Sequence, residues 1–147
     1  MYPTIPSSKR FICKKNPYHS VSEIKRGDII VFRAVWKDGK KYNFIWRVAG
    51  LPGDTLIIRD TQIIINEKEL PREKIREEGN LAIYKETNGN ATYHVAYLKE
   101  RISKDPSDIQ FVVPENHVYV LGDNRDNALD SRTTGPVAFD SIVAKKL

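Results

Sequence analysis

The stretch that decides the fold is residues 44–54, which read Phe44-Ile45-Trp46-Arg47-Val48-Ala49-Gly50-Leu51-Pro52-Gly53-Asp54. Proline fixes φ and glycine permits positive φ, so the last four residues predict a tight turn that closes a strand over 44–49. A second apolar, β-branched run covers 28–35 and begins at the turn Arg26-Gly27-Asp28. Apolar runs of this length that are separated by turns predict a fold built on β-sheet.

Shorter apolar runs continue this pattern along the chain. They predict further strands over residues 55–58, 61–65, 81–85, 92–98 and 118–121. Between the third and fourth of these lies Thr87-Asn88-Gly89-Asn90. Asn-Gly between two apolar runs is the strongest short-range signal for a hairpin, so we expect residues 81–98 to form one.

The remaining segments give weaker signals. Residues 72–78 and 136–145 are interpreted as helices, and the charged stretch 67–80 is the least ordered by composition. Together with the hairpin, it predicts an insertion over about 60–110 inside a single domain of residues 1–147. Antiparallel strands at this spacing favour a mostly β fold, a folded antiparallel sheet or partial barrel with a β-hairpin insertion.

Composition excludes several classes of protein. The 147 residues are 40% hydrophobic, which fits one folded domain and excludes a disordered tail. Apolar stretches of four or five residues are far shorter than the ~20 that span a bilayer, and no signal-peptide pattern is present. The single cysteine, Cys13, cannot form an internal disulfide or a thiolate zinc site. We expect no cofactor and no metal, and we assign no role to His19, His94 or His117.

Four segments, in order, resemble the motif boxes of bacterial type I signal peptidases. The segments are Met1-Tyr2-Pro3-Thr4-Ile5, Lys25-Arg26-Gly27-Asp28-Ile29-Ile30-Val31-Phe32, Arg47-Val48-Ala49-Gly50-Leu51-Pro52-Gly53-Asp54 and Gly122-Asp123-Asn124-Arg125-Asp126-Asn127-Ala128-Leu129-Asp130-Ser131-Arg132. Each box alone could be a common turn sequence, but four boxes in this order across nearly the whole chain are specific for the family. By this resemblance the chain is identified as a member of the S26 serine peptidase family.

The resemblance implies a fold and a mechanism. The family consists of membrane-anchored proteases that remove signal peptides, and it shares its folded sheet with self-cleaving repressor domains. A serine hydroxyl attacks the scissile carbonyl, and a neutral lysine amine with a pKa lowered by burial takes its proton. Nearby donors stabilise the oxyanion.

Aligned residue by residue, this sequence departs from the family at the three positions that perform this chemistry. The nucleophilic serine would stand immediately before Met1 and so lies outside the sequence. The lysine base would directly precede Arg47, where this chain has Trp46, whose indole only donates. The hydroxyl that orients the lysine would stand at Ala128. A truncated start would explain the missing serine. It would not explain Trp46 and Ala128, which lie inside the chain and both abolish activation of the lysine.

The other family positions are retained. The resemblance implies that Met1, Pro3, Ile5, Phe44 and Ile45 form an apolar groove for extended peptides. It also implies a structural loop, held by charge-assisted hydrogen bonds of Asp123, Arg125, Asp130 and Arg132. Strand alternation places Trp46 on the same face as Phe44 and Val48, and two interpretations of Trp46 stay open: core packing, or a plug in the former base pocket.

Three functional interpretations follow. The first is a signal-peptidase-like domain without catalysis that binds signal-peptide-like segments or precursor proteins at the extracytoplasmic face of the membrane. The second is an active, membrane-anchored peptidase whose anchor and serine lie upstream and whose base is unusual. The third is a nucleic-acid-associated domain related to repressor peptidases. The net charge of +5 is scattered and no helix-turn-helix pattern precedes the domain, so we expect no nucleic-acid partner.

Overall fold

The computed structural model describes residues 1–100 and 108–147, and its regular structure is mainly antiparallel β-strand. The strands are β1 (Cys13–Lys15), β2 (Ile29–Val35), β3 (Lys41–Gly50), β4 (Thr55–Arg59), β5 (Gln62–Ile65), β6 (Lys68–Glu69), β7 (Arg72–Glu78), β8 (Leu81–Asn88), β9 (Ala91–Leu98), β10 (Ile109–Val112), β11 (His117–Leu121), β12 (Val137–Ala138) and β13 (Ile142–Lys146). The short helices are η1 (Val21–Glu23), α1 (Ser131–Thr134) and η2 (Phe139–Ser141). The predicted mostly β fold is confirmed.

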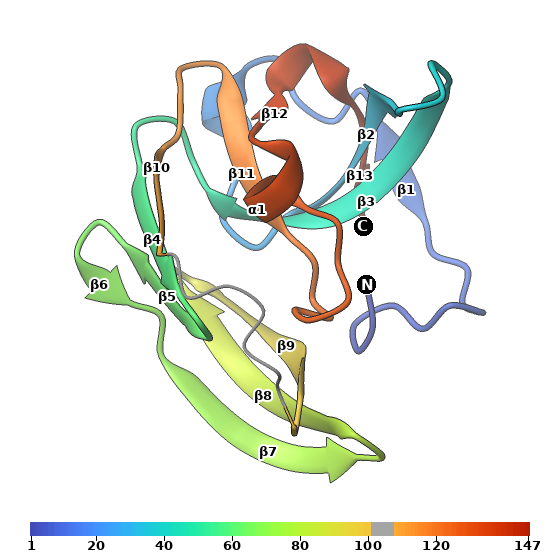
Figure 1. Ribbon diagram of the computed structural model, residues 1–147. Helices are drawn as coiled ribbons and strands as arrows, with labels where there is room; N and C mark the ends of the chain where they lie inside the picture. The colour runs from blue at the N-terminus through green and yellow to red at the C-terminus, as the bar shows by residue number, and fades with distance from the viewer. Residues whose placement is uncertain (101–107) are drawn as a thin grey trace.

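Within the described residues the strands form three sheets (Figure 1). The largest has the strand order β1-β13-β2-β3-β11-β12, the second β10-β4-β5-β6, and the third β7-β8-β9. In that part of the chain no sheet closes on itself, so the fold is a folded antiparallel sheet and not a closed barrel. The three-stranded sheet extends below the other two in the view of Figure 1.

Strands β3 and β11 hold the larger sheets together because they contribute to two cores. Val48 packs in one core with Val118 and Val120, whereas Ala49 packs in the other with Tyr119 and Leu121. Successive side chains of a strand point to opposite faces, so a strand that is covered on both faces is apolar throughout. This explains why 118–121 is a continuous apolar run rather than an alternating one.

The strands predicted from apolar runs are confirmed in position and type. Runs 28–35 and 44–49 form β2 and β3, which pair from Ile29↔Arg47 to Val35↔Lys41. The Asn-Gly hairpin is also confirmed: β8 and β9 pair without a register shift from Leu81↔Leu98 to Asn88↔Ala91. Gly89 at its turn has φ 61°, a conformation that favours glycine.

The helix predicted over residues 72–78 is wrong. This segment is strand β7, which pairs with β8 from Arg72↔Glu86 to Glu78↔Leu81. Its side chains are mostly charged and exposed, so the sequence carries no apolar face that would distinguish a helix from an edge strand. The expectation that 67–80 is the least ordered stretch is wrong for the same reason, since β6 and β7 lie within it.

The helix predicted over residues 136–145 is also wrong. The segment contains β12, the single turn η2 and most of β13, which lies between β1 and β2 in the large sheet. Pairing on both sides outweighs the weak local propensity of this stretch.

The predicted insertion over about 60–110 divides between two sheets. Strands β5 and β6 join β4 and β10, whereas β7, β8 and β9 form the separate three-stranded sheet. Part of the predicted insertion, residues 101–107, lies outside the described residues.

Candidate functional site

The four boxes identified in the sequence converge on Arg47, a buried residue of β3. Its Nε and Nη2 donate to the carboxylate of Asp123 at 2.8 and 2.7 Å. Its Nη1 donates to the carbonyl oxygen of Gly27 at 2.8 Å, and its Nη2 also reaches the hydroxyl of Thr4 at 3.1 Å. One guanidinium therefore joins segments that are more than 100 residues apart in the chain.

Asp123 completes this cluster and is fully buried. The Thr4 hydroxyl donates to its carboxylate at 2.5 Å, and the guanidinium of Arg47 stacks 4.1 Å from the ring centroid of Tyr93 on β9. Since the carboxylate is matched by one guanidinium and one hydroxyl, its charge is compensated within the fold. Thr4 and Gly27 belong to the quoted boxes, but sequence reasoning assigned them no role.

The loop after β11 is fixed by a second carboxylate, Asp130. It accepts hydrogen bonds from the Gly122 N–H at 2.8 Å and from Nε and Nη2 of Arg132, both at 2.8 Å. Arg132 Nη2 also donates to the carbonyl oxygen of Arg125 at 2.7 Å. Burial alone lowers the pKa of Arg132, but the hydrogen bond and the charge of Asp130 outweigh it, and the net pKa is raised.

Arg125 ties the same loop to the three-stranded sheet. Its Nη1 and Nη2 donate to both carboxylate oxygens of Glu86 at 2.9 and 2.5 Å, and both side chains are only 2% exposed. Burial lowers the pKa of Arg125, while the neighbouring Tyr97 and then Glu86 raise it well above its ordinary value. The sequence indicated Arg125 but missed Glu86, because an acid in a strand of mixed composition looks like an exposed one.

Trp46 and Ala128 lie against the same glycine. A Cβ built on Gly122 would lie 2.3 Å from the Cβ of Ala128, and 2.9 Å from Cζ3 of Trp46. Trp46 also packs against the buried cluster that contains Ile30 and Val48. The two residues that the resemblance aligns with the base and with the orienting hydroxyl, Trp46 and Ala128, therefore both lie against Gly122.

This arrangement has no proton acceptor at the base position. Indole nitrogen donates only, and Ala128 carries no polar atom. Two carboxylates of the loop, those of Asp123 and Asp130, are both bound to arginines. No group of three or more His, Cys, Asp or Glu side chains suited to a metal ion occurs among the described residues.

The first five residues lie beside this cluster. The Ile5 N–H donates to the Met1 carbonyl oxygen at 2.9 Å, which forms a turn that holds Pro3 and Thr4 over Arg47. The N-terminal segment and β3, both predicted to line a peptide groove, are therefore brought together.

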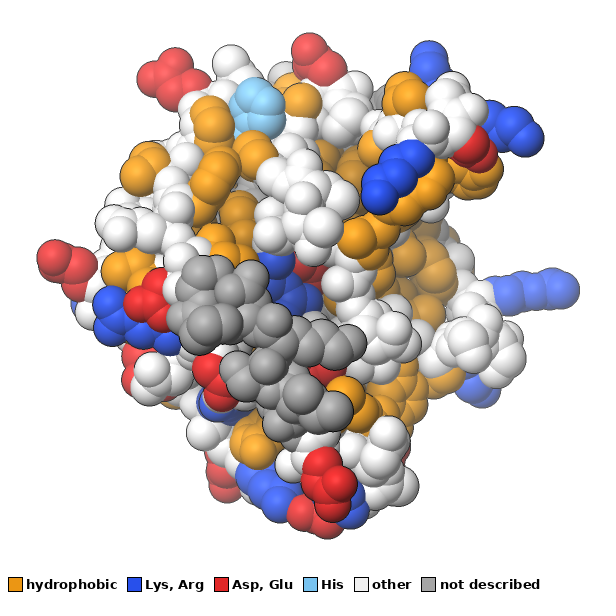
Figure 2. Space-filling view, in the orientation of Figure 1, with side chains coloured by type: hydrophobic (Ala, Val, Ile, Leu, Met, Phe, Trp, Pro, Cys, Tyr) orange, Lys and Arg blue, Asp and Glu red, His pale blue; other side chains and the backbone are white. Residues whose placement is uncertain are grey.

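Phe44 and Ile45 lie on opposite faces of β3. Phe44 stacks on Phe32 with ring centroids 5.8 Å apart and packs against the core, whereas Ile45 pairs across the sheet with Val31. β11 pairs with β3 only at residues 47–50, so residues 41–46 have no β11 partner on that side. Hydrophobic side chains line a hollow on the right of the face in Figure 2, close to the two chain ends marked in Figure 1.

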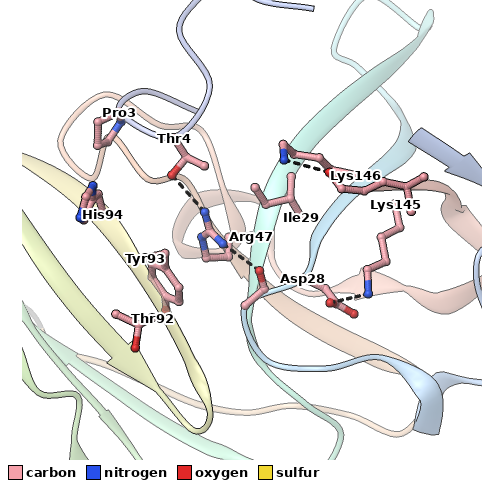
Figure 3. A pocket seen from close by; sticks show the side chains of 12 residues that line it. Pro3, Thr4, Asp28, Ile29, Arg47, Thr92, Tyr93, His94, Lys145 and Lys146 are labelled. Carbon is pink, nitrogen blue, oxygen red and sulfur yellow. Dashed lines mark hydrogen bonds and ion pairs between the residues drawn. The ribbon is translucent and has the colours of Figure 1, made fainter. Parts of the chain in front are cut away.

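A cleft with a volume of about 560 Å³ adjoins this cluster and shares Thr4, Gly27 and Arg47 with it (Figure 3). Its walls come from the N-terminal segment, from the start of β2, from β9 and from the end of β13. The lining residues are Pro3, Thr4, Gly27, Asp28, Ile29, Arg47, Thr92, Tyr93, His94, Lys145, Lys146 and Leu147. Neither Trp46 nor Ala128 lines it.

Comparison with known proteins assigns the class. The family model described as "Signal peptidase, peptidase S26" matches residues 1–147, and the chain belongs to this family. Signal peptidase I of Rickettsia massiliae is 40% identical over 136 residues, which cover 84% of this chain and 50% of that protein. Signal peptidase I of Pseudomonas aeruginosa is 33% identical over 117 residues, which cover 76% of this chain and 40% of that protein.

Among solved structures, a signal peptidase I from Enterococcus faecalis V583 matches with a TM-score of 0.48 and 28% identity, covering 81% of this chain and 92% of that one. The chain spans about half the length of the curated relatives from Rickettsia. Among the described helices, none is long and apolar enough to span a bilayer.

Proposed function

We propose that this chain is a signal-peptidase-like domain that binds extended, signal-peptide-like segments without cleaving them, at the extracytoplasmic face of the membrane. The observation that carries the proposal is the pairing of Trp46 with Ala128 across Gly122. The indole fills the position from which the family's lysine takes the serine proton, so a hydroxyl nucleophile would have no base at this position.

The retained parts of the site support peptide binding. The N-terminal segment is held against Arg47 and Asp123, and β3 keeps a side that β11 leaves unpaired over residues 41–46. An extended peptide that adds to such an edge gains main-chain hydrogen bonds, and pockets for its alternate side chains give specificity. Losing the catalytic pair removes transition-state stabilisation, but need not remove this ground-state binding.

The first test is proteolysis. The chain is incubated with a precursor protein that carries a signal peptide, alongside an active signal peptidase I as positive control. We expect no cleavage by this chain. Specific cleavage after a small residue that persists through purification would overturn the non-catalytic part of the proposal and favour a peptidase with an unusual base.

The second test is binding, followed by NMR of the labelled chain with a peptide that ends in Ala-x-Ala. We expect weak binding, because a short strand addition must offset the entropy of ordering the peptide. Shifts confined to residues 1–5 and 43–47 would support the groove. The absence of shifts at millimolar peptide would overturn it, and Trp46 would then be interpreted as a plug that closes the groove.

A further inference from the structure

Residues 1–11 are joined to the rest of the fold through the side chain of Thr4. Among the hydrogen bonds between described residues, those that leave this segment both belong to the Thr4 hydroxyl, which donates to Asp123 at 2.5 Å and accepts from Arg47 at 3.1 Å (Figure 3). In the same part of the chain, the backbone hydrogen bonds of the segment stay inside it.

Apolar packing does not replace this link. None of residues 1–11 belongs to the three clusters of buried apolar side chains that the described residues form. Met1, Pro3 and Ile5, which are predicted to line the peptide groove, are only half-buried. Their position beside β3 therefore depends on the hydrogen bonds of Thr4.

A hydroxyl is well suited to these two partners. The carboxylate of Asp123 only accepts hydrogen bonds and the guanidinium of Arg47 only donates them, whereas a hydroxyl does both. Thr4 is itself exposed, while Asp123 is fully buried and Arg47 is 6% exposed. The hydroxyl thus reaches from the surface to a buried ion pair, and hydrogen bonds to charged groups are stronger than those between neutral groups.

Both partners of the hydroxyl lie next to the proposed groove. Arg47 directly follows Trp46 on β3, and Asp123 lies in the loop after β11. The link through Thr4 therefore sets where the N-terminal segment lies relative to residues 41–46, which have no β11 partner.

We propose that Thr4 is the positioning residue of the peptide site: its hydroxyl holds residues 1–5 beside β3, so that both walls of the groove are in place before a peptide binds. The inference rests on the proposed function for the ligand and extends it to how the site is assembled. A site whose binding-competent form is only partly populated binds more weakly by that fraction. Without the hydroxyl, a peptide would have to order the segment as well.

The experiment compares Thr4→Val with Thr4→Ser. Valine keeps the shape of threonine but neither donates nor accepts through its side chain, whereas serine keeps the hydroxyl. Asp123 retains both hydrogen bonds from Arg47 in either variant, so we expect both to fold. Ser8→Ala is the matched control, because Ser8 lies in the same segment and its hydroxyl has no hydrogen-bond partner among the described residues.

The labelled variants are titrated with the Ala-x-Ala peptide, and binding is followed by NMR at residues 43–47. We expect Thr4→Val to weaken binding by roughly tenfold, the equivalent of one hydrogen bond to a charged group, and Thr4→Ser and Ser8→Ala to bind like the parent. Parent-like affinity of Thr4→Val would overturn the proposal, and so would an equal loss in Thr4→Ser. A Thr4→Val variant that does not fold would also overturn it, because the hydroxyl would then support the whole domain and not the segment alone.

A second readout needs no peptide. The heteronuclear NOE of the backbone amides of Tyr2, Thr4 and Ile5 reports motion on the picosecond to nanosecond timescale. It should fall in Thr4→Val alone, whereas a merely structural role would lower the melting temperature of the domain without releasing this segment.

The two readouts separate this inference from the proposed function. If the parent binds no peptide but the NOE falls only in Thr4→Val, the link through Thr4 stands and the proposed function fails. If the parent binds the peptide and the NOE is the same in all variants, only the role of Thr4 is refuted.

Discussion

The ion pair between Glu86 and Arg125 gives the sharpest test of how the loop after β11 is held. Both side chains are only 2% exposed, and the guanidinium meets both carboxylate oxygens at 2.5 and 2.9 Å. Because an arginine guanidinium is not deprotonated in proteins, it stays charged when its partner is removed. Glu86→Ala therefore leaves a buried charge with only neutral acceptors, such as the Gly122 carbonyl oxygen at 3.1 Å.

Breaking a buried pair in this way costs about 3–5 kcal/mol. For a chain of this length, 1 kcal/mol shifts the melting temperature by about 2–4 °C, so we expect a fall of roughly 6–20 °C. The assay is thermal and urea unfolding followed by circular dichroism. Glu77→Ala is the matched control on the same sheet: Glu77 pairs with Lys74 and Lys99 but is 45% exposed, so its loss should leave the stability nearly unchanged.

Replacing both partners separates the cost of an orphaned charge from the worth of the pair. The double variant Glu86→Leu, Arg125→Met removes the charge altogether, and we expect it to be more stable than Glu86→Ala. If Glu86→Ala and Glu77→Ala unfold at the same temperature and denaturant concentration, the buried pair does not hold the loop to the three-stranded sheet.

Three further predictions follow from the same contacts. Arg132→Ala and Asp130→Ala should each lower the free energy of unfolding by about 1–3 kcal/mol. This is less than the cost of breaking a fully buried pair, because the Arg132 side chain is 21% exposed. Melting of both variants at the parent's temperature would contradict this. Burial raises the pKa of Asp54, but hydrogen bonds from Arg26 and the Leu51 N–H outweigh it and hold the pKa below its usual value. Asp54 therefore stabilises the fold above about pH 4, and this stabilisation is lost as pH falls through the pKa of the folded state. In Asp54→Asn, the unfolding free energy measured in urea should fall less steeply with decreasing pH. An unchanged slope would contradict this. In Trp46→Lys, burial against the core should lower the amine pKa below about 10.4 in an NMR titration, and an ordinary value would show that no buried pocket exists there.

The strands that could be predicted are those whose own residues specify them. β2, β3 and β11 are apolar, and the β8–β9 hairpin has its Asn-Gly turn. β7 could not be predicted, because its mostly charged residues suit a helix surface and an exposed edge strand equally. Its conformation is decided by pairing with β8, a contact made outside the segment itself.

The candidate site likewise contains residues that the sequence could predict and residues that it could not. Resemblance to family motifs located Trp46, Ala128 and the loop carboxylates, and the contacts between Arg47 and Asp123 then joined the boxes. Glu86 could not be found from the sequence, because it differs from exposed acids only in its partner 39 residues away.

The three-stranded sheet makes buried polar contacts with the rest of the fold in addition to its own small core of Tyr93, Val95 and Tyr97. Glu86 binds Arg125, and Asn88 donates to the Ala49 carbonyl oxygen at 2.9 Å. The first contact fixes the loop after β11 against this sheet, and the second fixes the end of β8 against β3.

The charged residues of the loop and the uncharged residues 46 and 128 therefore differ in what their replacement would do to the fold. Asp123 and Arg125 each compensate a buried charge, so replacing either one leaves its partner orphaned inside the fold. Trp46 and Ala128 carry no charge and both lie against Gly122, so replacing either one leaves no buried charge without a partner. The proposed binding domain therefore depends on the buried ion pairs, and not on a proton acceptor at position 46.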